Sequence, residues 1–179
     1  MKKFLAQFLF LIFFFTYLLR IDNIKALVPY YYLPTIKNLE KESLSLGKNA
    51  YQLLFFGQLK ESLSLAKLAV QINKSDEKLW LILSETQIAN KLYKDALISL
   101  KKAQKINPNI SEIYFAQSSI HLKQSDLNKA KTALKKVLEI EPNNHRAIFQ
   151  LGNIFLMQKN YSSAIKLFER VVEIKPAFW

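Results

Sequence analysis

The residue types that carry enzyme chemistry are scarce in this sequence. It has no cysteine, and its two histidines, His121 and His145, form no His-Glu-x-x-His arrangement. The three glycines, Gly47, Gly57 and Gly152, do not make a phosphate-binding loop, and no serine occupies a nucleophile turn. The sequence therefore predicts a protein that is not an enzyme and that holds no metal and no other cofactor.

The charge of the chain limits its partners. The formal net charge is +12, but only Arg20, Arg146 and Arg170 are arginines, the residue type that bidentate recognition of phosphates and bases favours. Four consecutive windows of 34 residues from Ser43 carry +2, +3, +1 and +3, so no basic block occurs. We expect a solvated lysine-rich surface and no specific nucleic-acid site. Binding of nucleic acid or of anionic lipid is the alternative.

A hydrophobic segment opens the chain. Residues 4–19 contain no charge and are flanked by Lys3 and Arg20. As a helix they would span roughly 24 Å, which is short of the ~30 Å hydrocarbon layer. Residues 1–26 are interpreted either as a cleaved signal peptide or as a membrane anchor whose flanking cations reach the two interfaces. Lys2 and Lys3 favour a cytoplasmic amino end, whereas Arg20, Lys25 and Lys37 on the other flank favour the opposite orientation, so both topologies are open. We expect a membrane-associated or exported protein, on the periplasmic or thylakoid-lumen side.

Residues 27–42 are predicted to form a linker and the start of the first helix. Pro29 and Pro34 disfavour helix at and before their positions. The run Tyr30–Tyr32 is therefore expected to be extended and to pack against the helices that follow. Thr35 has the residue type of an N-cap.

From Ser43 the sequence repeats itself with a period of 34 residues. Four windows follow one another without insertion: 43–76, 77–110, 111–144 and 145–178. Small residues occupy two places in every window: Ala50, Ser84, Ser118 and Gly152 at the eighth, and Ser62, Ala96, Ala130 and Ala164 at the twentieth. The thirtieth place holds isoleucine, and the thirty-second holds proline except for Lys74 in the first window.

These residues resemble the tetratricopeptide-repeat family. The window 145–178 matches best, with Leu151, Gly152, Tyr161, Ala164, Phe168 and Pro176 on the family's pattern. The resemblance covers 136 of 179 residues. It implies an all-α fold, a right-handed α-α superhelix of four 34-residue repeats, preceded here by the hydrophobic helix and the Pro/Tyr linker.

The physical pattern of the windows leads to the same fold. Each window contains two amphipathic helices joined by a polar turn. The small residues let paired helices approach closely, and the proline ends the second helix. One hairpin cannot bury its apolar face alone, whereas stacked hairpins can. His121 falls at a packing place of such a helix, where a core role is expected, and His145 falls at an exposed helix start.

In this family the first helix of each repeat lines a concave groove through its second, fifth, ninth, twelfth and thirteenth places. The resemblance implies that partner contacts come from Tyr51, Phe55, Leu81, Glu85, Ile88, Phe115, Ser119, Leu122, Phe149, Asn153, Leu156 and Met157. The same places also hold Leu44, Gly47, Leu54, Lys78, Ala89, Glu112, Lys123 and Arg146. The lining is largely apolar, so a hydrophobic or amphipathic protein segment is the expected partner.

One specialisation of the family is not expected. Its clamp for acidic chaperone tails uses Lys and Asn at the fifth and ninth places of the first repeat, where Gly47 and Tyr51 stand. The layout is instead similar to short membrane-attached tetratricopeptide proteins of cyanobacteria and plastids. This implies a scaffold or adaptor that assists assembly of a membrane-associated complex, photosystem I included.

Two readings of the chain's end stay open. The final residues Pro176–Trp179 resemble the entry into a further repeat, which favours truncation. Alternatively, an uncapped apolar edge at Ile165, Phe168 and Val172 supports self-association. Truncation allows an alternative to the scaffold function. In that alternative the repeats are the amino-terminal targeting portion of a longer enzyme, such as a glycosyl- or sulfotransferase.

Overall fold

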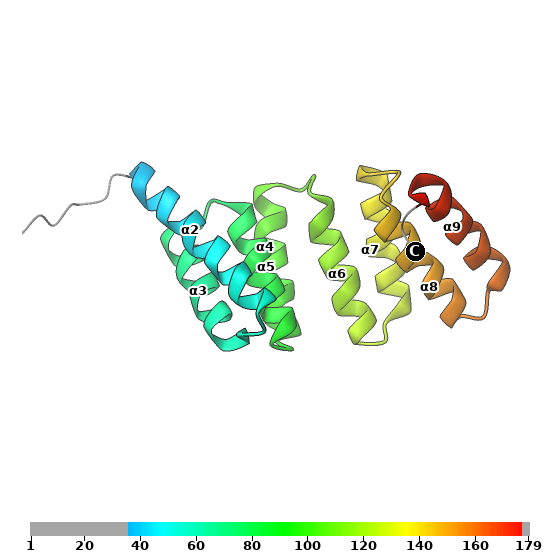
Figure 1. The fold of residues 1–179 in the computed structure, drawn as a ribbon, viewed down its shortest axis with the longest axis horizontal. Helices are drawn as coiled ribbons and strands as arrows, with labels where there is room; N and C mark the ends of the chain where they lie inside the picture. The colour runs from blue at the N-terminus through cyan, green and yellow to red at the C-terminus, as the bar shows by residue number, and fades with distance from the viewer. Residues whose placement is uncertain (1–35, 177–179) are drawn as a thin grey trace, which may run out of the picture. The chain divides into compact units, whose positions relative to one another are not determined.

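The computed structural model describes residues 36–176, which form eight α-helices and no strand. In chain order they are α2 (Ile36–Phe55), α3 (Leu59–Ile72), α4 (Glu77–Ala89), α5 (Tyr93–Ile106), α6 (Ser111–Lys123), α7 (Leu127–Ile140), α8 (His145–Met157) and α9 (Tyr161–Ile174). The all-α prediction is confirmed for these residues (Figure 1). The predicted hydrophobic segment 1–26 and the extended part of the linker lie outside them. Among the described helices, none combines the length and apolar character that a membrane crossing needs.

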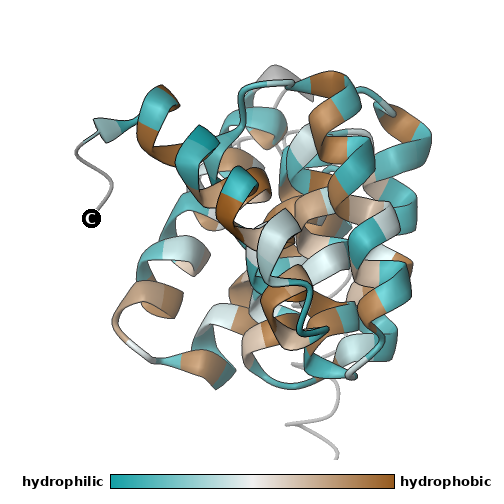
Figure 2. Cartoon of the chain, turned by 90° about the vertical axis from the view of Figure 1, so that its right-hand side faces the viewer, coloured by the Kyte–Doolittle hydropathy of each residue, from teal (hydrophilic) through white to brown (hydrophobic). Residues whose placement is uncertain are grey.

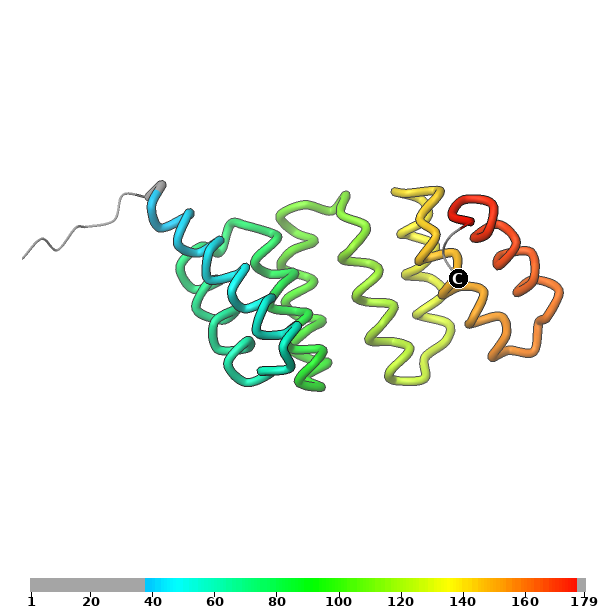
Figure 3. The backbone as a smooth tube through the Cα atoms, viewed as in Figure 1, coloured from blue at the N-terminus to red at the C-terminus, as the bar shows by residue number. Residues whose placement is uncertain are grey.

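The helix boundaries recur at the period of the sequence. The second helices of the four hairpins begin at Leu59, Tyr93, Leu127 and Tyr161, each 34 residues after the previous one. The helices pair as α2 with α3, α4 with α5, α6 with α7 and α8 with α9. Within the described residues the four hairpins follow one another in a row (Figure 3).

The apolar core lies mainly between one hairpin and the next. Three buried clusters join α3 to α4, α5 to α6, and α7 to α8. Leu100 and Leu134 are fully buried in the second and third clusters. Every described helix carries both hydrophobic and hydrophilic residues (Figure 2). Each of α3, α5 and α7 therefore buries its apolar side against the hairpin that follows, as stacked repeats require.

The small residues of the repeat are buried where paired helices meet. All eight residues at the eighth and twentieth places are buried. In the first hairpin the Ser62 Oγ donates a hydrogen bond to the Ala50 carbonyl oxygen at 2.7 Å. In the last, a Cβ added to Gly152 would stand 2.5 Å from Cε1 of Phe168. The close approach expected from the sequence pattern is therefore present at both ends of the row.

The turn inside each hairpin uses the same backbone conformation. Gly57, Lys91, Ser125 and Lys159, at the fifteenth place of the four windows, have φ values of 76°, 60°, 60° and 58°. Side-chain caps begin several of the helices. Asp76, for example, accepts from the Lys78 N–H at 2.8 Å. The four turns inside hairpins lie along one edge of the row, and the turns between hairpins lie along the opposite edge (Figure 1).

Candidate functional site: the inner face of the first helices

All twelve predicted contact residues lie on the first helix of a hairpin. They are Tyr51 and Phe55 on α2; Leu81, Glu85 and Ile88 on α4; Phe115, Ser119 and Leu122 on α6; and Phe149, Asn153, Leu156 and Met157 on α8. None of them is fully buried. Phe55 is 84% exposed, Met157 65% and Tyr51 53%. Side chains this apolar and this exposed are available to a partner.

The contacts between helices show how the first helices are arranged along the row. Helix α4 contacts both α2 and α6, which are the neighbouring first helices. The second helices α3, α5 and α7 make their main contacts with first helices and not with one another. The first helices of the first three hairpins therefore contact one another directly, and the second helices of the described residues make no comparable contacts with each other. We call the surface formed by the twelve residues the inner face.

A charged group occupies the middle of the inner face. The Arg146 guanidinium lies over the Phe115 ring, 4.6 Å from its centroid, in a cation–π contact. Burial raises the pKa of the Glu85 carboxyl; the nearby Arg146 lowers this pKa, and the negative charge of Glu112 raises it. These residues come from three successive first helices. The inner face is therefore apolar with a mixed-charge centre, which suits a segment that carries polar groups as well as apolar ones.

Sequence reasoning placed Glu85, Glu112, Phe115 and Arg146 at groove-lining places but did not predict that they interact. Glu112 and Arg146 stand at the second place of the third and fourth windows, and Glu85 stands at the ninth place of the second. Each window considered alone gives no sign that these places meet. The signal is available only when the second place of one repeat is placed beside the ninth place of another, as stacking does.

Aromatic pairs stand at both ends of the inner face. Phe55 and Phe56, at the end of α2, make an edge-to-face contact with centroids 5.6 Å apart. Phe149 on α8 packs against Phe168 on α9, also with centroids 5.6 Å apart. The Ser119 Oγ donates to the Phe115 carbonyl oxygen at 3.1 Å, so this hydroxyl is bonded within its own helix. The aromatic rings therefore offer a partner more contact surface than the Ser119 hydroxyl does. The Phe168 ring also positions the Phe149 ring through their contact.

The two histidines show no ligand arrangement. In the part of the chain that the structure describes, no group of His, Cys, Asp and Glu side chains could hold a metal ion. The ring of His121 is half-buried, and its Nδ1 is buried without a hydrogen-bond partner. His145 begins α8 but is half-buried rather than exposed. It lines a cavity of about 500 Å³ together with its neighbours 141–146.

Comparison with known proteins agrees with the repeat architecture. A family model described as the TPR domain of cytochrome c-type biogenesis protein H matches residues 60–177. A search of curated protein sequences found no match.

Three solved structures illustrate the shared fold. A thermophilic TPR protein from Thermus thermophilus is 20% identical, with a TM-score of 0.70 over 80% of this chain and 82% of that one. MamA from Desulfovibrio magneticus RS-1 is 15% identical, with a TM-score of 0.64 over 82% and 78%. The first TPR of Spaghetti (RPAP3), solved bound to the HSP90 peptide SRMEEVD, is 19% identical, with a TM-score of 0.62 over 67% and 95%.

These likenesses establish the fold, and the family match covers well over half of the chain. The tetratricopeptide resemblance seen in the sequence is thereby confirmed. The protein belongs to the tetratricopeptide-repeat family, in the group described as the cytochrome c-type biogenesis protein H TPR domain.

Proposed function

We propose that the inner face binds an extended or helical segment of another protein and that the chain is a non-enzymatic adaptor. The observation that carries this proposal is the row of exposed and half-buried apolar side chains on four successive first helices. A soluble surface does not usually keep so many large apolar groups together without a partner. The Spaghetti structure, with a peptide bound to the same fold, supports the choice of a peptide segment as partner.

The charged centre defines what the segment carries. Phe115 and Phe149 offer aromatic surface to apolar side chains, whereas Glu85 and Arg146 offer opposite charges close to one another. A segment with apolar residues on either side of a polar or charged one complements this arrangement. The acidic-tail clamp is a poor match, because Gly47 and Tyr51 replace its Lys and Asn.

We propose further that the partner belongs to a membrane-associated complex under assembly. The description of the matching family makes cytochrome c biogenesis the first process in which to seek it. Photosystem I assembly, expected from the layout of the chain, is the second. The hydrophobic segment 4–19 supports a location at or beyond a membrane in both cases.

The test is partner capture by inner-face variants. The double variant Phe115→Ala/Phe149→Ala removes two rings from the inner face, and we expect the retained partner to fall by at least about tenfold. The matched control is Leu68→Ala/Ile98→Ala, which truncates two exposed apolar residues on the second helices α3 and α5. Circular dichroism must show that both variants keep their helix content.

A second variant separates binding from stability. Ser119 lies half-buried on the inner face, and Ser119→Arg adds bulk and charge there without emptying the core. The proposal would be contradicted if both inner-face variants captured as much partner as the unsubstituted chain. It would also be contradicted if the α3/α5 control lost as much partner as they do.

A further inference from the structure

One edge of the row exposes large apolar side chains. We define the turn edge as the four segments 55–61, 89–95, 123–129 and 157–163, each of which joins the two helices of a hairpin. Its exposed apolar residues are Phe55 (84%), Phe56 (74%), Leu92 (38%), Met157 (65%) and Tyr161 (58%). Phe56 and Leu92 lie between helices, and Phe55, Met157 and Tyr161 are the helix-end residues beside the first and fourth turns. Exposed apolar groups at this edge of the row are accessible to a flat surface that approaches the helix ends.

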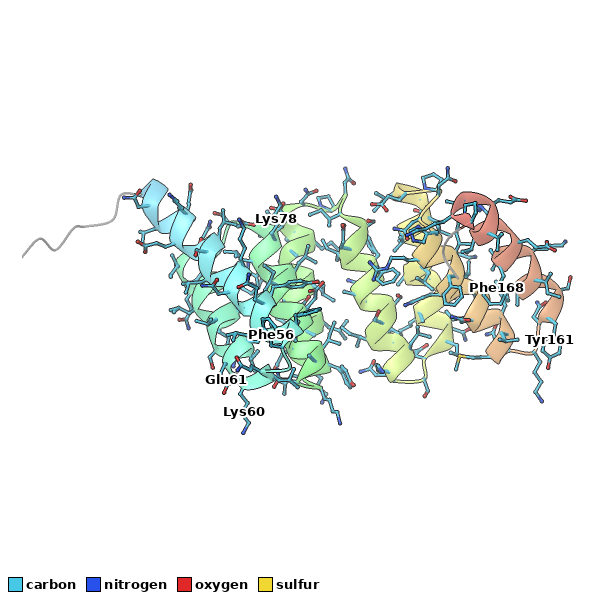
Figure 4. The ribbon with its side chains drawn as sticks, viewed as in Figure 1. Phe56, Lys60, Glu61, Lys78, Tyr161 and Phe168 are labelled. Carbon is cyan, nitrogen blue, oxygen red and sulfur yellow. The ribbon has the colours of Figure 1, made fainter. Side chains whose placement is uncertain are left out.

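The same edge is rich in lysine. Six exposed lysines lie on it: Lys60, Lys91, Lys94, Lys123, Lys129 and Lys159. Three acidic residues accompany them, Glu61, Asp95 and Asp126, so the net charge of the turn edge is +3. Asp126 is engaged by Lys129, with the Nζ and Oδ2 atoms 2.8 Å apart. Figure 4 shows Lys60 pointing away from the helices at this edge.

The opposite edge provides an internal comparison. Its turns between hairpins, segments 72–78, 106–112 and 140–146, carry Lys74, Lys78 and Arg146 against Asp76, Glu77, Glu112 and Glu141, a net charge of −1. The exposed large apolar residues of these segments are the aliphatic Ile106 (40%) and Ile140 (36%). Aromatic exposure and positive charge therefore coincide on one edge of the row and not on the other.

We propose that the turn edge docks on an anionic membrane surface. Phe56, Met157 and Tyr161 would enter the interfacial region, where aromatic and apolar side chains are favoured. The lysines would neutralise lipid phosphates from above it while their stems lie along the apolar groups. Six cations without a single arginine suit a diffuse layer of headgroups better than the bidentate contacts of nucleic acid.

This arrangement has a consequence for the inner face. Helices run from one edge of the row to the other, so docking by the turn edge stands the helices upright on the membrane. The inner face then stands perpendicular to the membrane plane and stays accessible from the side. Its charged centre lies above the lipid. A partner segment close to the same membrane would reach it. The turn edge shares Phe55 and Met157 with the inner face, whereas Phe56, Tyr161 and the six lysines belong to the turn edge alone. The docking proposal does not depend on the proposed partner binding.

The experiment measures which edge meets the lipid in the full chain. Because the chain has no cysteine, Gln58→Cys on the turn edge and Asn109→Cys on the opposite edge each introduce a single thiol for a fluorophore. Both positions are exposed. The vesicles contain phosphatidylcholine, either alone or mixed with phosphatidylglycerol. Each composition is also prepared with spin-labelled lipid. We expect quenching by spin-labelled lipid at position 58 and little at position 109, and only with phosphatidylglycerol present.

Charge variants test the cause. Lys60→Gln/Lys94→Gln removes two cations from the turn edge. Each lysine near an anionic surface raises the affinity for it roughly fivefold. We therefore expect quenching at position 58 to need at least about tenfold more anionic lipid in this variant. The matched control, Lys74→Gln/Lys78→Gln on the opposite edge, should leave the titration unchanged. Equal quenching at both positions, stronger quenching at 109, or equal effects of the two double variants would overturn the proposal. So would displacement of the vesicles by single-stranded RNA at equal phosphate concentration.

Discussion

At the scale of single residues, Glu85 shows how the inner face treats charge. Its carboxyl is partly buried, and this burial is the main cause of its raised pKa. Arg146 offsets part of this effect, and the same guanidinium is held by the Phe115 ring. The ionised carboxylate is therefore tolerated rather than stabilised. A partner that offered a cation here would recover the energy that burial costs.

The raised pKa of Glu85 gives a pH-dependent stability. The folded state holds the proton more tightly than the unfolded chain, so protonated Glu85 contributes stability below its ordinary pKa of 4.5, and that contribution is lost as the pH rises through the folded value. We therefore expect Glu85→Gln to raise the urea midpoint at pH 7, with an advantage that shrinks below pH 4.5. Urea unfolding at several pH values measures it.

Two further variants complete this test. Glu169→Gln removes an exposed carboxylate from α9 and serves as the control. Arg146→Ala should enlarge the advantage of Glu85→Gln, because the guanidinium lowers the Glu85 pKa. A urea midpoint for Glu85→Gln that matched the unsubstituted chain at every pH would show that the carboxyl is better solvated than the structure implies.

At the scale of elements, the break between hairpins keeps its geometry even where its residues differ. Asn73 and Asn107 follow α3 and α5 with φ and ψ of −132°, 101° and −140°, 104°. The Trp80 Nε1 donates to the Lys74 carbonyl oxygen at 2.8 Å, as the Tyr114 hydroxyl donates to that of Pro108 at 3.2 Å. Lysine and proline thus occupy the same structural place, so the absence of proline in the first window did not mislead the repeat assignment.

This equivalence predicts that Lys74→Pro stabilises the protein. The Lys74 N–H donates no hydrogen bond within the described residues, so proline removes none. The extended conformation of Asn73 is also the one that a following proline favours. We expect a gain of about 0.4–1 kcal/mol in the free energy of unfolding, mainly from a less flexible unfolded chain. Lys74→Ala, by contrast, should stay within about 0.5 kcal/mol. Chemical denaturation distinguishes the two, and a loss of stability in Lys74→Pro would show that the two breaks differ.

The elements were the most predictable part of the protein, and particular residues explain why. The small residues at the eighth and twentieth places and the breaks at Pro108 and Pro142 fix helix length and pairing through local geometry. The inner-face group of Glu85, Phe115 and Arg146 was harder, because its members meet through stacking. The half-buried state of His145 was also missed, because its place at the start of a helix indicated an exposed side chain.

At the scale of the whole described row, stability comes from neighbours only. Helix α9 packs mainly against α8, while α4 packs against α2, α3, α5 and α6. In such an array each repeat depends on the interfaces on its two sides. The terminal helix has one neighbour, and part of its surface stays open, with Ile165 54% and Val172 42% exposed.

Hydrogen exchange should reveal this graded stability. We expect amides of α9 to exchange at least about tenfold faster than those of α4 to α7, because α9 can open without disturbing another hairpin. Leu134→Ala, which empties a fully buried site between α7 and α8, should cost about 2–5 kcal/mol and accelerate exchange in α7–α9 more than in α2–α4. Uniform acceleration across all eight helices would mean that the row unfolds as one cooperative unit.

The central claim is that the inner face of the first helices is the partner surface. Site-specific photocrosslinking in intact cells tests it most directly. A photoreactive phenylalanine replaces Ser119 or Asn153 on the inner face, and Lys101 or Lys135 on the second helices, where both lysines are exposed. We expect both inner-face positions to crosslink to one defined segment of a single polypeptide and the outer positions not to crosslink to it. Crosslinks to that polypeptide from the outer positions alone would contradict it.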